Sequence, residues 1–262
     1  MSHTATPDRD FGSLVRIMQI LRKECPWDRE QTHESLKDLM VEEVYEAIDA
    51  IDRKDYDDLR KELGDMLLHV VFHAEMGSEH GGFDIGDVIY SIQDKLIRRH
   101  PHVFADTTVT GTSEVLKNWE QIKKKENPKG SVLDGVPASL PGLLRAQRMQ
   151  EKAAGVGFDW PDWHGAWEKL KEEMGELEAV LEGDDAQRKA EEFGDVMFSM
   201  VNVGRYFGIN SEDSLRITNA KFQQRFSHIE RRASEMGLQL KDMTLEEMDK
   251  LWDEAKTVIG DR

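Results

Sequence analysis

The chain has 262 residues, of which 39% are hydrophobic and 33% charged, and its formal net charge is −17 at pH 7. So much negative charge argues against a nucleic-acid polymer or an anionic membrane as the main partner. A single cysteine excludes an intrachain disulfide and indicates a reducing compartment.

No targeting or membrane segment is evident in the sequence. The first ten residues carry no apolar core of a signal peptide. No apolar run approaches the ~20 residues that a membrane helix needs. We therefore expect a cytoplasmic protein.

Helical periodicity dominates the first half of the chain. In residues 11–24 the apolar residues recur at the spacing typical of an amphipathic helix. Cys25-Pro26-Trp27-Asp28 breaks this pattern, and Gly81-Gly82 stops a later one. We expect the helices of the first half at about residues 11–24, 35–51, 56–76, 85–99 and 112–125.

Residues 126–142 carry three prolines and three glycines without a helical period, which predicts a linker. The helical series then repeats, at about residues 143–154, 165–181, 185–207, 211–236 and 244–258. Thr244 and Glu247 form a possible capping box for the last of these helices. No convincing strand is present, so we expect an all-α protein with an N-terminal unit at 1–125, a linker at 126–142 and a C-terminal unit at 143–262.

One carboxylate pattern, E-E-x-x-E followed by E-x-G-D, occurs twice in the chain, 130 residues apart. Acids three residues apart share a helix face, and oxygen ligands converging from two helices suit a hard cation. Such a cation usually indicates phosphate chemistry. The first copy comprises Glu42, Glu43, Glu46, Glu62 and Asp65, and the second comprises Glu172, Glu173, Glu176, Glu192 and Asp195.

The spacing within each copy predicts which acids face each other. In an antiparallel hairpin, residues equidistant from the turn lie level. With a turn at Gly183-Asp184, Glu173 should face Asp195 and Glu176 should face Glu192. The first copy has the same symmetry about residue 54.

The carboxylates of each hairpin lie close enough to repel one another, so a positive charge is needed to offset them. Two unscreened charges ~4 Å apart repel by about 4 kcal/mol at an effective dielectric of 20. The stretches around residues 66–72 and 196–201 are apolar nearly all round, which predicts buried helices beside the acids. Bound Mg²⁺, or Mn²⁺, would resolve both problems. The alternative is an acidic face that merely lies in water, and identical spacing in two copies makes that alternative weaker.

Basic and aromatic residues distinguish the two copies. Lys221 and Arg225 are four residues apart, as are Trp252 and Lys256. Lys and Arg suit phosphate oxygens, and a tryptophan can stack on a base or sugar. Each of these residues has an equally good structural explanation as a solvent-facing cation or a core tryptophan.

The sharper difference lies one turn before each acid cluster. Lys169 and Arg188 of the second copy correspond to Leu39 and Asp58 of the first. The second copy is therefore better equipped to hold a triphosphate. We expect it to be the working site and the first copy to be weakened or structural.

These motifs resemble those of the MazG family of nucleoside triphosphate pyrophosphohydrolases, in its two-unit form. Besides the acid motif, the chain carries CPWDREQTH at residues 25–33 and NAKFQQRF at 219–226. The resemblance implies an all-α, usually homodimeric, Mg²⁺-dependent enzyme that cuts NTPs and dNTPs of broad base range to the monophosphate and pyrophosphate. It also implies that the C-terminal unit is the catalyst.

The resemblance assigns site residues one by one. The implied metal ligands are Glu173, Glu176, Glu192 and Asp195, with Glu43, Glu46, Glu62 and Asp65 as a weaker second set. The implied nucleotide contacts are Lys169, Arg188, Lys221, Arg225, Trp252 and Lys256. We expect water to attack the α-phosphorus, oriented by Glu172 or by one of the ligand acids.

Two other classes of protein remain as alternatives. An acidic helical interaction module would bind neither metal nor nucleotide. A di-iron carboxylate bundle would need Glu-x-x-His pairs. His69 and His73 follow Asp65, but their counterparts are Ser199 and Val203. His33, His100 and His102 are interpreted as structural or surface residues, and base and sugar preference stay open.

Overall fold

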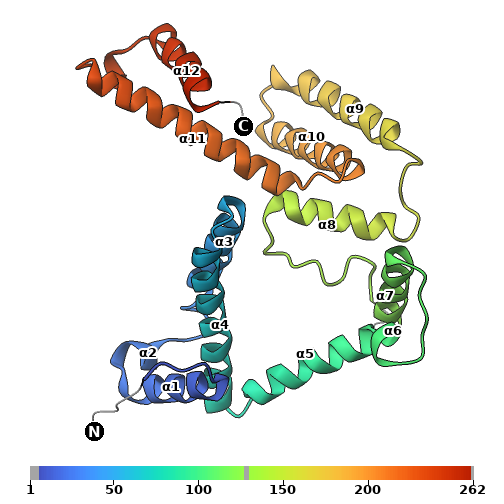
Figure 1. Cartoon of the computed structure of the whole chain (residues 1–262). Coiled ribbons are helices and arrows are strands. Elements are labelled where there is room, and N and C mark those ends of the chain that lie inside the picture. The colour runs from blue at the N-terminus through green and yellow to red at the C-terminus, as the bar shows by residue number, and fades with distance from the viewer. Residues whose placement is uncertain (1–5, 127–129, 261–262) are drawn as a thin grey trace. The chain divides into compact units, whose positions relative to one another are not determined.

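The computed structural model describes residues 6–126 and 130–260 (Figure 1). Across these residues the chain is helical and contains no strand, which confirms the all-α expectation. The chain divides into two compact units, residues 1–128 and 129–262. The division falls inside the segment expected to be a linker, of which residues 127–129 lie outside the described part.

The first unit is built around the antiparallel pair α3 and α4, with α1 against α4. Its helices are α1 (Phe11–Glu24), α2 (Pro26–Glu30), α3 (Lys37–Arg53), α4 (Tyr56–Glu79), α5 (Ile85–Arg99), α6 (Pro101–Phe104) and α7 (Thr112–Glu126).

The second unit repeats the hairpin as α9 and α10, α8 packs against α10 and α11, and α11 pairs with α12. Its helices are α8 (Gly142–Ala154), α9 (Trp163–Leu181), α10 (Ala186–Tyr206), α11 (Ser211–Glu235) and α12 (Leu245–Ile259), with a short 3-10 helix, η1 (Leu240–Asp242), before α12. The capping box of Thr244 and Glu247 is confirmed.

The break expected over residues 25–28 is confined to Cys25. Its backbone is extended, and the chain becomes helical again at Pro26 to form α2. Proline fits the first turn of a helix, because its ring fixes φ near the helical value and the missing N–H is not needed there. Expecting a longer break was therefore wrong.

The turns that close both hairpins lie where the acid spacing requires them. Lys54 ends α3 in the left-handed conformation, with φ 57°, and the Asp55 side chain then caps α4. Asp185 caps α10 in the same way. Aspartate at this position accepts a hydrogen bond from a backbone N–H that the helix leaves unpaired. Each turn therefore fixes the register of the acids on its two helices.

Each unit has a small apolar core. In the first unit it forms where α1 and the segment before α3 meet α4, and it contains Met18, Leu36, Val71, Phe72 and Met76. The second unit has one cluster between α9 and α10 around Ala166, Leu170 and Val203, and another between α11 and α12 around Ile229, Ala233, Met243 and Leu251.

The apolar stretches after the acids are only partly buried, contrary to expectation. Val71, Phe72 and Val201 are buried, but Leu67, Val70, Met197, Phe198 and Met200 are exposed in the single chain. The reason is geometric, because the helices that contact α4 (α3, α1 and α5) and those that contact α10 (α9, α8 and α11) leave part of each helix uncovered.

Candidate active site

Three carboxylates converge between α9 and α10. Glu173, Glu176 and Glu192 each offer one ligand oxygen, and these oxygens all lie within 4.8 Å of one another. Glu173 is buried, Glu192 is half-buried and Glu176 is exposed. The group thus opens from the helix interface toward solvent, where a substrate can approach it.

The charges of this group act on one another. Partial desolvation raises the pKa of Glu176, and the charges on Glu173 and Glu192 raise it further. Lys169 opposes this effect. Its Nζ lies 2.8 Å from an oxygen of Glu172 and 2.8 Å from an oxygen of Glu173, and these bonds raise the pKa of Lys169. The lysine ammonium therefore neutralises part of the charge on Glu172 and Glu173.

Two further residues expected at this site lie at its margin. Nε of Arg188 is 3.6 Å from Oε1 of Glu192. Asp195 is exposed and does not belong to the three-carboxylate group among the described side chains. It follows Glu192 by three residues on the same helix, so the two side chains share a helix face.

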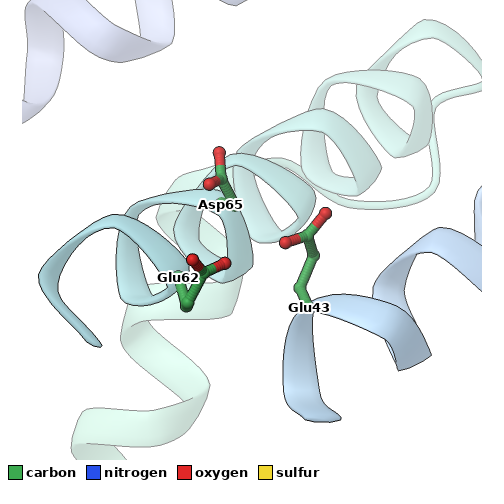
Figure 2. Close-up of side chains that lie close together, drawn as sticks. All are labelled: Glu43, Glu62 and Asp65. Atoms are coloured by element: carbon green, nitrogen blue, oxygen red, sulfur yellow. The ribbon is translucent and has the colours of Figure 1, made fainter. Parts of the chain in front are cut away.

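The first unit contains a second group of acids. Figure 2 shows Glu43 on α3 reaching toward Glu62 and Asp65 on α4, and one oxygen of each lies within 4.8 Å of the others. Burial raises the pKa of Glu43, and the charge on Asp65 raises it further. Burial also raises the pKa of Glu62, followed by the charge and hydrogen bond of Glu46. Glu43 thus lies close to Asp65, and Glu46 lies close to Glu62, as their spacing from the turn predicts.

No lysine or arginine corresponds to Lys169 in the first unit, where Leu39 stands at that position. Asp58, the counterpart of Arg188, binds two cations itself, with Arg53 at 2.5 Å and Lys61 at 3.0 Å. Both pairs lower the pKa of Asp58. Arg53 and Lys61 therefore neutralise Asp58 instead of the acid group.

The aromatic and basic residues of the C-terminal segment meet on the α11–α12 hairpin. The guanidinium carbon of Arg225 lies 5.6 Å from the ring centre of Trp252. The Phe222 ring lies 5.2 Å from the same tryptophan. Trp252 packs against the α11–α12 core and is also partly exposed, so both expected roles agree with its position. Lys221 lies one turn before Arg225 on α11, and Lys256 pairs with Asp253 at 2.8 Å.

Comparison with known proteins identifies the family. The profile described as the MazG nucleotide pyrophosphohydrolase domain matches residues 31–104, within the first unit. A nucleoside triphosphate pyrophosphohydrolase of Escherichia coli strain K12 is 45% identical over 251 residues, which cover 93% of this chain and 95% of that protein. The chain belongs to the MazG family. The resemblance inferred from the sequence motifs is thereby confirmed.

Other MazG-like relatives align over nearly the whole chain. The nucleoside triphosphate pyrophosphohydrolase/pyrophosphatase MazG of Thermotoga maritima is 46% identical over 250 residues, 94% of this chain and 95% of that protein. The uncharacterized protein YabN of Bacillus subtilis is 50% identical over 252 residues, 94% of this chain and 52% of YabN. Alignments of this length indicate that both units belong to the MazG arrangement.

One set of contacts in the second unit stabilises the segment before α9 and is not predicted by the sequence motifs. Arg205 and Tyr206, at the end of α10, bind Asp159 in the segment before α9, at 2.6 Å and 2.5 Å. Tyr206 also donates to the backbone oxygen of Trp160. These bonds hold the segment that leads into α9. From the sequence, only a gap between the helices expected at about residues 143–154 and 165–181 is evident here.

Among the described residues, no helix combines the length and the apolar character needed to cross a bilayer.

Proposed function

We propose that the chain hydrolyses nucleoside triphosphates to the nucleoside monophosphate and pyrophosphate, and that Glu173, Glu176 and Glu192 form the centre of its active site. The observation that carries the proposal is their convergence within 4.8 Å beside Lys169 and Arg188. The N-terminal acid group lacks this pair of cations. Membership of the MazG family supports the reaction.

The acid group fits a divalent ion such as Mg²⁺, with Mn²⁺ as an alternative. All its donors are carboxylate oxygens, which these ions prefer to nitrogen or sulfur. Desolvation, followed by the charges of Glu173 and Glu192, raises the pKa of Glu176, and a bound cation would offset both effects. We infer that Glu173, Glu176 and Glu192 hold the ion, with Asp195 as a further ligand. When bound, Mg²⁺ neutralises phosphate charge and lowers the pKa of its coordinated water.

Lys169 exchanges its partners when the nucleotide binds. If Glu173 held the ion, the Lys169 ammonium would be free to move from the carboxylates to phosphate oxygens. Arg188, at the rim of the site, can bind the same group in bidentate fashion. Positive charge at these positions stabilises the negative charge that grows on the leaving pyrophosphate.

Glu172 is then placed to act on the attacking water. It is exposed and adjacent to Glu173, and its only described ion pair is with Lys169. Once Lys169 has left, the Glu172 carboxylate can accept a proton from water as oxygen attacks the α-phosphorus. The bond from that phosphorus to the bridging oxygen breaks, and pyrophosphate leaves.

The α11–α12 hairpin provides the contacts for the rest of the nucleotide. Trp252, backed by Arg225, offers an aromatic surface for the base or sugar. Lys221 and Lys256 lie one turn from Arg225 and Trp252, respectively, where they can bind phosphate or ribose oxygens. Because stacking reads no hydrogen-bonding edge of the base, we expect a broad base range.

A second copy of the chain would cover apolar side chains that one copy leaves exposed on α10. Phe193, Met197 and Met200 form an exposed stripe at four- and three-residue spacing along α10, with 57%, 39% and 51% exposure. Contiguous exposed apolar surface of this kind favours association. We infer a homodimer in which these faces are covered. A monomeric mass in light scattering at micromolar concentration would contradict this inference.

Product analysis tests the reaction directly. ATP with Mg²⁺ should give AMP and pyrophosphate, whereas ADP with free phosphate would show a different cleavage. Glu176→Ala should lower turnover about a hundredfold or more, because it removes a metal ligand. The matched change Glu46→Ala in the first unit should have a much smaller effect. An equal loss in both variants would show that the first unit is also catalytic.

A further inference from the structure

A buried histidine joins the two helices that carry the expected base and ribose contacts. His228 lies on α11 and is only 5% exposed. Its Nε2 is 3.1 Å from an oxygen of Glu254 on α12, and its Nδ1 is 2.9 Å from a guanidinium nitrogen of Arg231. A guanidinium only donates, so Nδ1 accepts and Nε2 carries the hydrogen donated to Glu254. The ring is therefore held at both nitrogens, in one tautomer and one orientation.

Glu254 receives a second positive group from α11. Nε of Arg232 lies 2.9 Å from the same carboxylate oxygen that faces His228, and Arg232 also pairs with Glu235 at 2.6 Å. Hydrogen bonds to an ionised carboxylate are stronger than those between neutral groups, above all where one partner is buried. Side chains from two turns of α11 thus meet α12 at one carboxylate.

This carboxylate lies between the two α12 residues that are expected to contact the nucleotide. Glu254 follows Trp252 by two residues and precedes Lys256 by two. Two residues turn an α-helix by about 200°, so the Glu254 side chain leaves α12 on another side from both. On α11, His228 follows Arg225 by three residues, and the Arg225 guanidinium carbon is 5.6 Å from the Trp252 ring centre. The histidine bond can therefore fix how Trp252 faces Arg225 without covering the aromatic surface.

The apolar contacts between the two helices lack this directional character. The buried cluster of the hairpin consists of Ile229, Ala233, Met243 and Leu251. Apolar burial is non-directional, whereas a hydrogen bond weakens steeply when its length or angle changes. The bond at His228 therefore adds a fixed register to helices that apolar packing alone holds together.

The first unit carries a related sequence pattern without the acid. His102 follows Arg99 by three residues, and Gln121 follows Trp119 by two, where the second unit has a glutamate. Arg99 binds Glu126 at 2.6 Å. Among the described side chains, none offers a hydrogen bond to the buried Nδ1 of His102. At these positions, the histidine–carboxylate bond thus belongs to the unit that is expected to bind the nucleotide.

We propose that His228 and Glu254 are positioning residues for the nucleotide, which hold α12 where Trp252 can stack on the base. The proposal rests on the proposed function, since that function assigns Trp252 to the substrate. Neither residue belongs to the three-carboxylate group. Their loss should therefore weaken binding in the ground state and the transition state alike, which raises KM and leaves kcat nearly unchanged.

Kinetics of the full chain with ATP and Mg²⁺, followed by pyrophosphate release, test this proposal. His228→Ala should raise the KM for ATP about tenfold, within the range for losing one base stack, with little change in kcat. His228→Gln should restore most of the affinity, because its amide can donate to Glu254 from the position of Nε2. The control Glu246→Ala removes the exposed pair with Lys250 on the same helix and should change neither constant.

Inorganic triphosphate separates positioning from general damage to the site, because it has no base to stack. Its inhibition constant against ATP should stay nearly unchanged in His228→Ala. A KM for ATP equal to that of wild type would overturn the proposal, as would an equal rise in the KM and in this inhibition constant. If circular dichroism shows that His228→Ala is unfolded, Glu254→Ala provides the same comparison.

Failure of the reaction and failure of the positioning role give different results. A wild type that binds ATP in calorimetry without releasing pyrophosphate would contradict the proposed function, and the dissociation constants of ATP and inorganic triphosphate would then replace KM and the inhibition constant. The double variant His228→Ala/Glu254→Ala should bind ATP no more weakly than either single variant, because both remove one contact. Additive losses would show that the two residues do not act through each other.

Discussion

Lys169 neutralises part of the negative charge of the C-terminal acid group by bonding to Glu172 and Glu173 at 2.8 Å. In the proposed mechanism, a divalent ion and this ammonium would compete for Glu173 before the nucleotide arrives, and both would neutralise its phosphates afterwards. Lys169 would then oppose metal binding in the free enzyme and support catalysis in the complex.

Replacing Lys169 should separate these two effects. In Lys169→Met we expect Mg²⁺ to bind the nucleotide-free protein a few-fold more tightly, because the competing ammonium is gone. NTP turnover should fall about 10²-fold, the usual cost of losing a group that stabilises transition-state charge. Calorimetry with Mg²⁺ alone and a pyrophosphate-release assay measure the two quantities.

Lys171→Met is the matched control, because Lys171 pairs with Glu168, away from the three-carboxylate group. It should change neither quantity. Weaker Mg²⁺ binding in Lys169→Met would mean that the lysine organises the acids instead of competing for them.

The acids could be predicted from the sequence because their spacing on a helix is local information. Glu173 and Glu176 share a face by helical geometry, and the symmetry of the turn brings Glu192 level with them. Nδ1 of His33 lies 2.7 Å from Nδ1 of His73, although the two residues are 40 positions apart in the chain. No local spacing predicts such a contact, so His33 was interpreted as a structural or surface residue.

At the scale of the helices, an ion pair between buried Arg22 and exposed Glu79 joins α1 and α4. Arg22 is buried, and its guanidinium donates to both carboxylate oxygens of Glu79, at 2.7 Å and 2.6 Å. It also donates to the backbone oxygens of Asp28 and Gln31. A single side chain thereby fixes α1, α2 and the following segment against α4.

Breaking this pair should destabilise the first unit in a pH-dependent way. Glu79→Gln leaves a buried guanidinium without its counter-charge, at a cost of about 1–3 kcal/mol at pH 7. The Arg22 hydrogen bond lowers the pKa of Glu79 from its ordinary 4.5. Stabilisation by the charged pair is therefore complete above that value and is lost as the pH falls through the lowered pKa.

Urea unfolding of wild type and variant between pH 3 and pH 7 measures this effect. The difference in unfolding free energy should be largest at pH 7 and should shrink toward pH 3. Asp57→Asn removes the exposed pair with Arg60 and should cost little at any pH. A constant difference between wild type and Glu79→Gln would exclude the ionic origin.

The long helices could be predicted from periodicity, whereas the short ones could not. Pro26–Glu30 and Pro101–Phe104 contain too few residues to show a helical period. Each begins with proline, which in a sequence indicates a break as readily as a start. They form because the longer helices on either side limit the path of the chain.

At the scale of the whole molecule, both units carry a group of acids that repel one another. The pKa values of Glu43, Glu62 and Glu176 are all raised, with desolvation as the first cause and neighbouring carboxylates as the next. For an acid with a raised pKa, the folded state binds more protons than the unfolded state. These groups therefore destabilise the fold progressively as the pH rises above about 4.5.

At this scale, local sequence patterns predicted least well which apolar side chains are exposed. Residues 196–201 of α10 are apolar on nearly every side, yet Phe198 and Met200 are exposed in the single chain. Periodicity reports that a face avoids water, but it does not say whether the same chain or another copy covers it.

Magnesium should reverse the effect of pH on stability. Mg²⁺ binds the deprotonated acids and stabilises the folded state by linkage, so the gain in Tm over a chelator-treated sample should increase from pH 5 to pH 8. Scanning calorimetry at both values, with and without Mg²⁺, measures this gain. The double variant Glu46→Gln/Glu176→Gln removes one acid from each group and should lose most of it. A gain that is equal at both pH values, or that persists in the double variant, would show that Mg²⁺ binds elsewhere on this negatively charged protein.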